Sequence, residues 1–192
     1  MVDPTATIPE PISLAQFLNM GDDGGAIAAD AELMEGKIIP KMAPQRFHSK
    51  TQRAILRILE DWGEAWGEIG VEWSVLLQRQ GKPWVPIPDV LYVGSDRLPP
   101  RPLEDEPCPV PPDLVVEIIS PGQRFGDMAA KAMDYLIAGV LRVWVIDPRA
   151  QTITVFHPEA MAITYRGDAP LTNPLFSDLT LTPTHLFQKA GL

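Results

Sequence analysis

The chain has 192 residues, of which 45% are hydrophobic, and it carries a formal net charge of -9 at neutral pH. This length suits one substantial domain and is short for two. No apolar run approaches the roughly 18 residues of a membrane span, and the first residues lack the basic start of a secretion signal, so we expect a cytoplasmic protein without a membrane partner.

The charges are unevenly distributed along the chain. Residues 1–36 hold seven acidic residues and no Lys or Arg, whereas residues 37–57 hold six basic residues and no acidic one. The overall acidity argues against a protein that coats nucleic acids non-specifically, because that affinity comes from cationic side chains. It does not exclude nucleic-acid contact by the basic segment.

The first 30 residues are predicted to form an N-terminal arm with a short helix. Residues 1–12 include three prolines, and Ser13 is suited to cap a helix that runs to Met20. We expect residues 31–192 to form a single domain. Its first predicted element is a strand or hairpin over residues 33–42, with the turn at Gly36.

Residues 46–62 show the pattern of an amphipathic helix. At about 100° per residue, four basic side chains fall within about 60° of one another and the apolar side chains fall opposite. This stripe is a candidate DNA-binding surface, although a solvated helix face has the same pattern. His48 projects onto the inner side, either as a hydrogen-bonded core residue or as part of a site. The four basic residues are Arg46, Lys50, Arg53 and Arg57.

The rest of the chain favours strands around one further helix. Two strands are expected at residues 71–78 and 87–93, joined through a turn at Gly81, and a stiff proline-rich loop follows at 99–112. The helix is expected at residues 127–138, with Met128, Ala132, Met133 and Leu136 on its buried face. Further strands are expected at 114–119, 142–146, 152–156 and 162–165, and a strand end and short helix at 179–187.

Two carboxylates stand in otherwise apolar strands. Glu117 interrupts the run at 114–119, and Asp89 lies at the start of the strand at 87–93. A buried strand does not normally hold an ionised carboxylate without a partner or a metal, and two such groups on neighbouring strands suit one hard divalent cation. The alternative is that Asp89 forms a turn and Glu117 pairs with a buried Arg such as Arg142. The spacing leaves both interpretations open.

Four segments in this order resemble a known family. They are Pro88-Asp89, the run from Asp113 to Pro121 (DLVVEIISP), the spaced residues Asp127, Lys131 and Tyr135, and the run from Gly139 to Pro148 (GVLRVWVIDP). Together they are similar to the Uma-two-type endonuclease family of the restriction-endonuclease-like PD-(D/E)XK superfamily. The resemblance runs from about Glu35 to Phe156 and extends weakly to the C-terminus.

The resemblance implies an α/β (α+β) fold with a central mixed β-sheet flanked by helices. It also implies that Asp89 and Glu117 hold Mg²⁺ or Mn²⁺, with the main-chain carbonyl of Ile118 as a further ligand, and that the protein is a homodimer. Glu35 resembles an early acidic position of the family that completes a metal site. Its other interpretation is an exposed acid before a glycine turn.

The sequence departs from the superfamily pattern at the catalytic lysine, whose place is taken by Ile119. The resemblance implies that Lys131, on the following helix, reaches back to the same site. The alternative is that Lys131 makes ordinary surface pairs with Asp127 and Asp134. Three secondary candidates for the site are His48, Ser120 and Tyr135.

These observations predict a metal-dependent endonuclease that hydrolyses DNA, with Asp89, Glu117 and Lys131 as its catalytic residues. Two other functions remain open. One is a catalytically inactive protein of the same fold that acts as a binding or scaffold module. The other is a metal-dependent phosphoesterase that acts on RNA or on a small phosphate ester.

Overall fold

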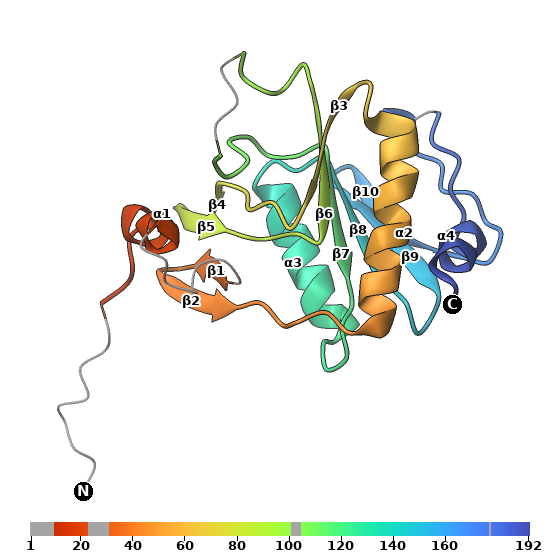
Figure 1. Ribbon diagram of the computed structural model, residues 1–192, viewed down its shortest axis with the longest axis horizontal. Coiled ribbons are helices and arrows are strands. Elements are labelled where there is room, and N and C mark those ends of the chain that lie inside the picture. Colours follow the sequence, from red (N-terminus) through yellow and green to blue (C-terminus); the bar gives the residue numbers. More distant parts are fainter. Residues whose placement is uncertain (1–9, 23–30, 101–104, 177) are drawn as a thin grey trace, which may run out of the picture.

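The computed structural model describes residues 10–22, 31–100, 105–176 and 178–192. The described part contains four α-helices and ten strands (Figure 1). The helices are α1 (Leu14–Asp22), α2 (Arg46–Gly63), α3 (Phe125–Ile137) and α4 (Pro183–Ala190), and a short 3-10 helix spans Pro174–Phe176. The strands are β1 (Ala31–Met34), β2 (Lys37–Pro40), β3 (Gly67–Val71), β4 (Leu77–Arg79), β5 (Lys82–Val85), β6 (Val90–Gly94), β7 (Leu114–Ile118), β8 (Arg142–Asp147), β9 (Thr152–His157) and β10 (Ala160–Arg166).

The strands form two sheets. The larger has six strands in the order β10-β9-β8-β7-β6-β3, and the smaller has four in the order β2-β1-β5-β4. In the larger sheet β7 and β8 are parallel and the other neighbours are antiparallel, so the sheet is mixed. Helices α2 and α4 cover one of its faces and α3 covers the other, while the smaller sheet and α1 lie to one side (Figure 1). The predicted central mixed sheet flanked by helices is confirmed.

Strand β7 divides the core because its side chains alternate between the two faces. Leu114, Val116 and Ile118 pack on the side of α2 and α4. Val115 packs on the opposite side with residues of α3. Glu117 has the parity of Val115, so the one carboxylate of this strand is directed toward α3.

The two long helices follow the predicted amphipathic patterns with one exception. The apolar face of α2 is buried, and His48 is buried with it. On α3, Met133 was predicted to be buried but is 49% exposed. At about 100° per residue Met133 lies about 140° from Met128, outside the arc that faces the sheet. Tyr135 falls inside this arc and is fully buried.

One predicted strand pair is wrong. The turn at Gly81 joins β4 to β5 in the smaller sheet, whereas the strand expected at 87–93 is β6, which pairs with β3 in the larger sheet. Pro86 and Pro88 separate β5 from β6. Because proline has no N–H to donate, the chain leaves one sheet there and enters the other.

The N-terminal helix begins where its sequence predicts. The Ser13 hydroxyl accepts a hydrogen bond from the amide of Gln16, whose side chain in turn accepts one from the amide of Ser13. This reciprocal pair is a capping box. Most of the predicted arm, residues 1–9 and 23–30, lies outside the described residues. None of the described helices is long and apolar enough to cross a membrane.

Candidate active site

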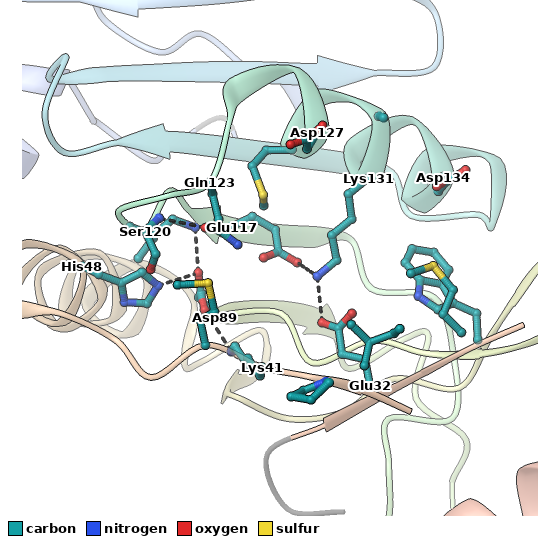
Figure 2. A pocket seen from close by; sticks show the side chains of 18 of the residues that line it. Glu32, Lys41, His48, Asp89, Glu117, Ser120, Gln123, Asp127, Lys131 and Asp134 are labelled. Atoms are coloured by element: carbon teal, nitrogen blue, oxygen red, sulfur yellow. Dashed lines mark hydrogen bonds and ion pairs between the residues drawn. The ribbon is translucent and has the colours of Figure 1, made fainter. Parts of the chain in front are cut away.

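A pocket of about 470 Å³ opens between the smaller sheet, the start of α2 and α3. Figure 2 shows Glu117 and Lys131 pointing toward Glu32, with Lys41 beside Asp89, whereas Asp127 and Asp134 lie farther out on α3. Its inner carboxylates are Glu32, Asp89 and Glu117, and the ammonium groups beside them belong to Lys41 and Lys131. Asp127, Asp134 and Arg79 also line the pocket.

Asp89 lies directly before β6 and is 2% exposed. Val90 pairs with Val116, and continuing this antiparallel register by one residue places Asp89 opposite Glu117. The two strands that the sequence singled out therefore bring their carboxylates to one place.

Both carboxylate oxygens of Asp89 have partners. Oδ2 lies 3.0 Å from His48 Nε2 and accepts a 2.7 Å hydrogen bond from the amide of Ile118, and Oδ1 lies 2.9 Å from Lys41 Nζ. Burial alone would raise the pKa of Asp89. The His48 hydrogen bond, the Lys41 charge and the Ile118 amide together outweigh burial and hold the pKa below its ordinary value. Asp89 is therefore an ionised carboxylate in a buried position.

Two side chains of α3 contact the same carboxylate oxygen of Glu117. Tyr135 donates a 2.8 Å hydrogen bond to Oε1, and Lys131 Nζ lies 3.0 Å from the same atom. Burial raises the pKa of Glu117, and the charges of Asp89 and Glu32 raise it further, while Lys131 opposes them. A positive charge beside Glu117, such as that of Lys131, therefore favours its ionised form.

Lys131 is held between two carboxylates that come from different sheets. It donates a 2.7 Å hydrogen bond to Glu32 Oε1 and also faces Glu117 (Figure 2). Burial would lower the pKa of Lys131, but the two carboxylates more than compensate and raise it above its ordinary value. Lys131 thus reaches back to the strand carboxylates. Its suggested surface partner Asp134 pairs instead with Arg79, at 2.8 Å.

Two of the sequence interpretations do not match the observed contacts. Arg142, the suggested partner of Glu117, donates to the carbonyl of Leu141 at the opposite end of β8. Glu35 lies in the turn between β1 and β2, with a φ of 54°, and its carboxylate pairs with Arg79 rather than facing Lys131. The β1 carboxylate that reaches the pocket is Glu32.

Sequence reasoning missed Glu32 and Lys41. Glu32 carried a usable signal, because it interrupts the apolar strand Ala31–Met34 as Glu117 interrupts β7, and it is 6% exposed. Its Oε1 also accepts a hydrogen bond from the amide of Ile87, which fixes it between the two sheets. Lys41 lies in an irregular segment after β2, where neither periodicity nor spacing marks it.

Of the remaining candidates, Ser120 lies in the pocket and the four basic residues lie along α2. Ser120 is buried and lines the pocket. Three residues of the basic stripe, Arg46, Arg53 and Arg57, are exposed on α2. The fourth, Lys50, donates a 3.1 Å hydrogen bond to the carbonyl of Gly191, so it ties α2 to the end of α4.

Residues 16–184 match the model of the Uma2 family, which is described as "Putative restriction endonuclease". The chain belongs to the Uma2 family. A solved structure described as a "putative nuclease belonging to DUF820", from Anabaena variabilis ATCC 29413, is 27% identical, with a TM-score of 0.77. The match covers 94% of this chain and 99% of that one, so the Uma2 chain shares its fold over nearly the whole length. A search of curated proteins found no match.

The donor set of this Uma2 chain suits a hard divalent cation in chemistry and in charge. Asp89 and Glu117 offer carboxylate oxygens, which Mg²⁺ and Mn²⁺ prefer. Within the described ranges, no three acidic, His or Cys side chains converge on one point, so the two carboxylates would need main-chain or water oxygens to complete a coordination shell. The buried Lys41 Nζ beside Asp89 has no well-aligned hydrogen-bond partner in the described part of the chain. The Lys41 ammonium is thus a cation that already pairs with the Asp89 carboxylate without a hydrogen bond.

Proposed function

We propose that this Uma2-family chain is a metal-dependent endonuclease that hydrolyses DNA phosphodiester bonds in the pocket beside α3. The observation that carries the proposal is a buried pair of carboxylates, Asp89 directly before β6 and Glu117 on the neighbouring strand β7, with Lys131 projecting to Glu117 from α3. Family membership and the similar solved structure, which is described as a nuclease, support the reaction class.

Asp89 and Glu117 would hold Mg²⁺ or Mn²⁺, with the carbonyl of Ile118 as a further ligand. Such an ion would supply the Lewis acidity that offsets the charge developing on a phosphate under attack. The buried position of both carboxylates supports this role, because charge interactions are strongest where water is excluded.

Lys131 would act as a fixed positive charge and not as a base. Its raised pKa keeps the ammonium protonated at neutral pH, so it is suited to position a water molecule or to stabilise negative charge on the phosphate. Tyr135 would orient Glu117 through their hydrogen bond. His48 would hold Asp89 in the same way.

The third acidic position is proposed for Glu32 in place of Glu35. Glu32 shares Lys131 with Glu117, whereas Glu35 is occupied by Arg79. Strand β1 would thereby help to fix the lysine. Ser120 and the exposed arginines of α2 are proposed as substrate contacts, because Ser120 lines the pocket and the guanidinium groups are free to meet phosphates.

The proposal is tested by incubating plasmid, linear and single-stranded DNA, and RNA, with the protein in Mg²⁺, Mn²⁺ or EDTA. We expect the wild type to cut DNA in either metal and not in EDTA. Glu117→Gln should lower the cleavage rate by on the order of a thousandfold, because it removes several kcal/mol of charge stabilisation. Glu60→Gln, an exposed position on α2, is the matched control and should cut at the wild-type rate.

Three outcomes would contradict the proposal. DNA binding without cleavage in any metal would identify an inactive binding module. Cleavage of RNA but not DNA would identify a different phosphoesterase. Equal cleavage by Glu117→Gln and the wild type would show that the activity does not come from this pocket.

A further inference from the structure

The two lysines in the pocket are held in different ways. Lys131 donates a hydrogen bond to Glu32 and also faces Glu117, at 2.7 and 3.0 Å. Lys41 Nζ lies 2.9 Å from Asp89 Oδ1, yet it makes no well-aligned hydrogen bond to any described residue. Within the described residues, Lys41 is therefore held by ion pairing without a hydrogen bond, whereas Lys131 has both.

The oxygen that Lys41 covers is the one that the protein leaves for a cation. Asp89 Oδ2 is already engaged by His48 and by the amide of Ile118. Lys41 is the one side chain, among those the structure describes, within ion-pair distance of Oδ1. A divalent ion that approaches Asp89 through Oδ1 must therefore meet the ammonium of Lys41 first.

A second carboxylate lies on the outer side of Lys41. Glu72 Oε1 is 3.7 Å from Lys41 Nζ, and the Glu72 side chain is 42% exposed, compared with 3% for Asp89. The ammonium thus lies between a buried and an exposed carboxylate. If the Lys41 ammonium moved away from Asp89, it would still have a carboxylate partner, because Glu72 is already within reach.

We propose that Lys41 is an internal counter-cation, which neutralises Asp89 in the metal-free protein and competes with the divalent cation for Oδ1. This inference rests on the metal site of the proposed function. It names Lys41 as the residue that sets the affinity of that site for the divalent cation. The physical reason is that a buried carboxylate needs a positive partner at all times. Lys41 supplies that charge before the metal arrives and is displaced toward Glu72 when it binds. Lys41 is a positioning residue, because it acts on the metal through Asp89.

The test compares Mn²⁺ binding by metal-stripped wild type, Lys41→Met and Lys41→Arg in isothermal titration calorimetry. Lys41→Met keeps the length of the side chain and removes its charge, so we expect it to bind Mn²⁺ about tenfold more tightly, the order of one partly buried ion pair. Lys41→Arg keeps the charge and should bind within about threefold of wild type. Lys37→Met, an exposed lysine on β2, is the control and should match the wild type.

Thermal unfolding gives a second readout. In EDTA, Lys41→Met should unfold at a lower temperature than wild type, because Asp89 has lost its neutralising charge. Saturating Mn²⁺ should raise its unfolding temperature more than that of wild type. Lys41→Gln is a second neutral variant, which should show the same gain in Mn²⁺ affinity if Lys41→Met does not fold.

The inference is overturned if the folded neutral variants bind Mn²⁺ no more tightly than wild type, which includes the case in which none of them binds it. It is also overturned if Lys41→Arg gains as much affinity as Lys41→Met. DNA cleavage separates this result from the proposed function. A wild type that cuts DNA while Lys41→Met gains no affinity contradicts this inference alone, and a gain in affinity without DNA cleavage contradicts the nuclease proposal alone.

Discussion

Buried charges in the pocket beside α3 are balanced by direct contact. The three inner carboxylates, Glu32, Asp89 and Glu117, face the ammonium groups of Lys41 and Lys131, a surplus of one negative charge when all five are ionised. Asp127 and the Asp134–Arg79 ion pair also line the pocket, so its full set of ionised groups carries a surplus of two. This surplus explains why neighbouring carboxylates add to the effect of burial on the pKa of Glu117. An additional cation would relieve the surplus.

Tyr135→Phe tests how much one neutral contact contributes to this balance. The Tyr135 hydroxyl is buried, and burial together with the nearby carboxylates raises its pKa well above the ordinary value, so it remains a donor over the working pH range. Removing it leaves Glu117 with one partner fewer, and we expect the free energy of unfolding to fall by about 1–3 kcal/mol. Urea unfolding in EDTA measures this change. Unchanged stability would show that the hydrogen bond does not support Glu117.

At the scale of elements, sequence patterns predicted the pocket residues that lie on regular strands and helices, where side-chain periodicity applies. Because side chains alternate along a strand, the face of the sheet on which the β7 carboxylate lies follows from its position. Lys131 and Tyr135 are four residues apart on α3, so they share one face of the helix. Glu117, Lys131 and Tyr135 were therefore predictable as a group from the strand, the helix and the family resemblance. Lys131 and Tyr135 both contact Glu117.

The same patterns failed where the chain leaves regular structure. Glu35 and Glu32 are three residues apart, and which of them enters the pocket depends on where β1 ends and its turn begins. Lys41 follows a proline between two elements, and no periodicity defines the direction of its side chain. The pairing of β4 with β5 was missed because nothing in the proline-rich segment before β6 indicates that β5 and β6 belong to different sheets.

Two hairpin glycines offer a controlled test of how α1 is attached. Gly36 and Gly81 have φ values of 74° and 73°, so alanine is strained at both. A Cβ atom on Gly36 would lie 2.5 Å from Pro11 Cβ, whereas one on Gly81 would meet nothing within 4 Å. The amide of Ile12 also donates to the carbonyl of Gly36. Gly36 is thus where the segment before α1 rests on the smaller sheet.

We expect Gly81→Ala to lower the free energy of unfolding by about 1–2 kcal/mol, from backbone strain alone. Gly36→Ala should lower it further, and limited proteolysis with mass spectrometry should detect faster cleavage between residues 10 and 22. Equal stability and equal cleavage in the two variants would contradict the proposed contact between this segment and the hairpin.

For the whole molecule, the structure changes the meaning of the net charge of -9. Glu32, from the acidic N-terminal block, lies in the pocket. Of the basic segment that follows, Lys41 lies in the same pocket and Lys50 contacts the end of α4. Fewer basic groups are therefore free for nucleic acid than the stripe on α2 indicated. The homodimer implied by the family resemblance and the single domain at residues 31–192 stay predictions.

We propose that Asp89 and Glu117 share one divalent cation. Anomalous X-ray scattering from crystals of the full chain soaked in Mn²⁺ locates such an ion directly. We expect one strong anomalous peak within roughly 2.0–2.6 Å of an oxygen from each of the two carboxylates. Crystals that show no peak between Asp89 and Glu117, or that place Mn²⁺ elsewhere, would contradict it.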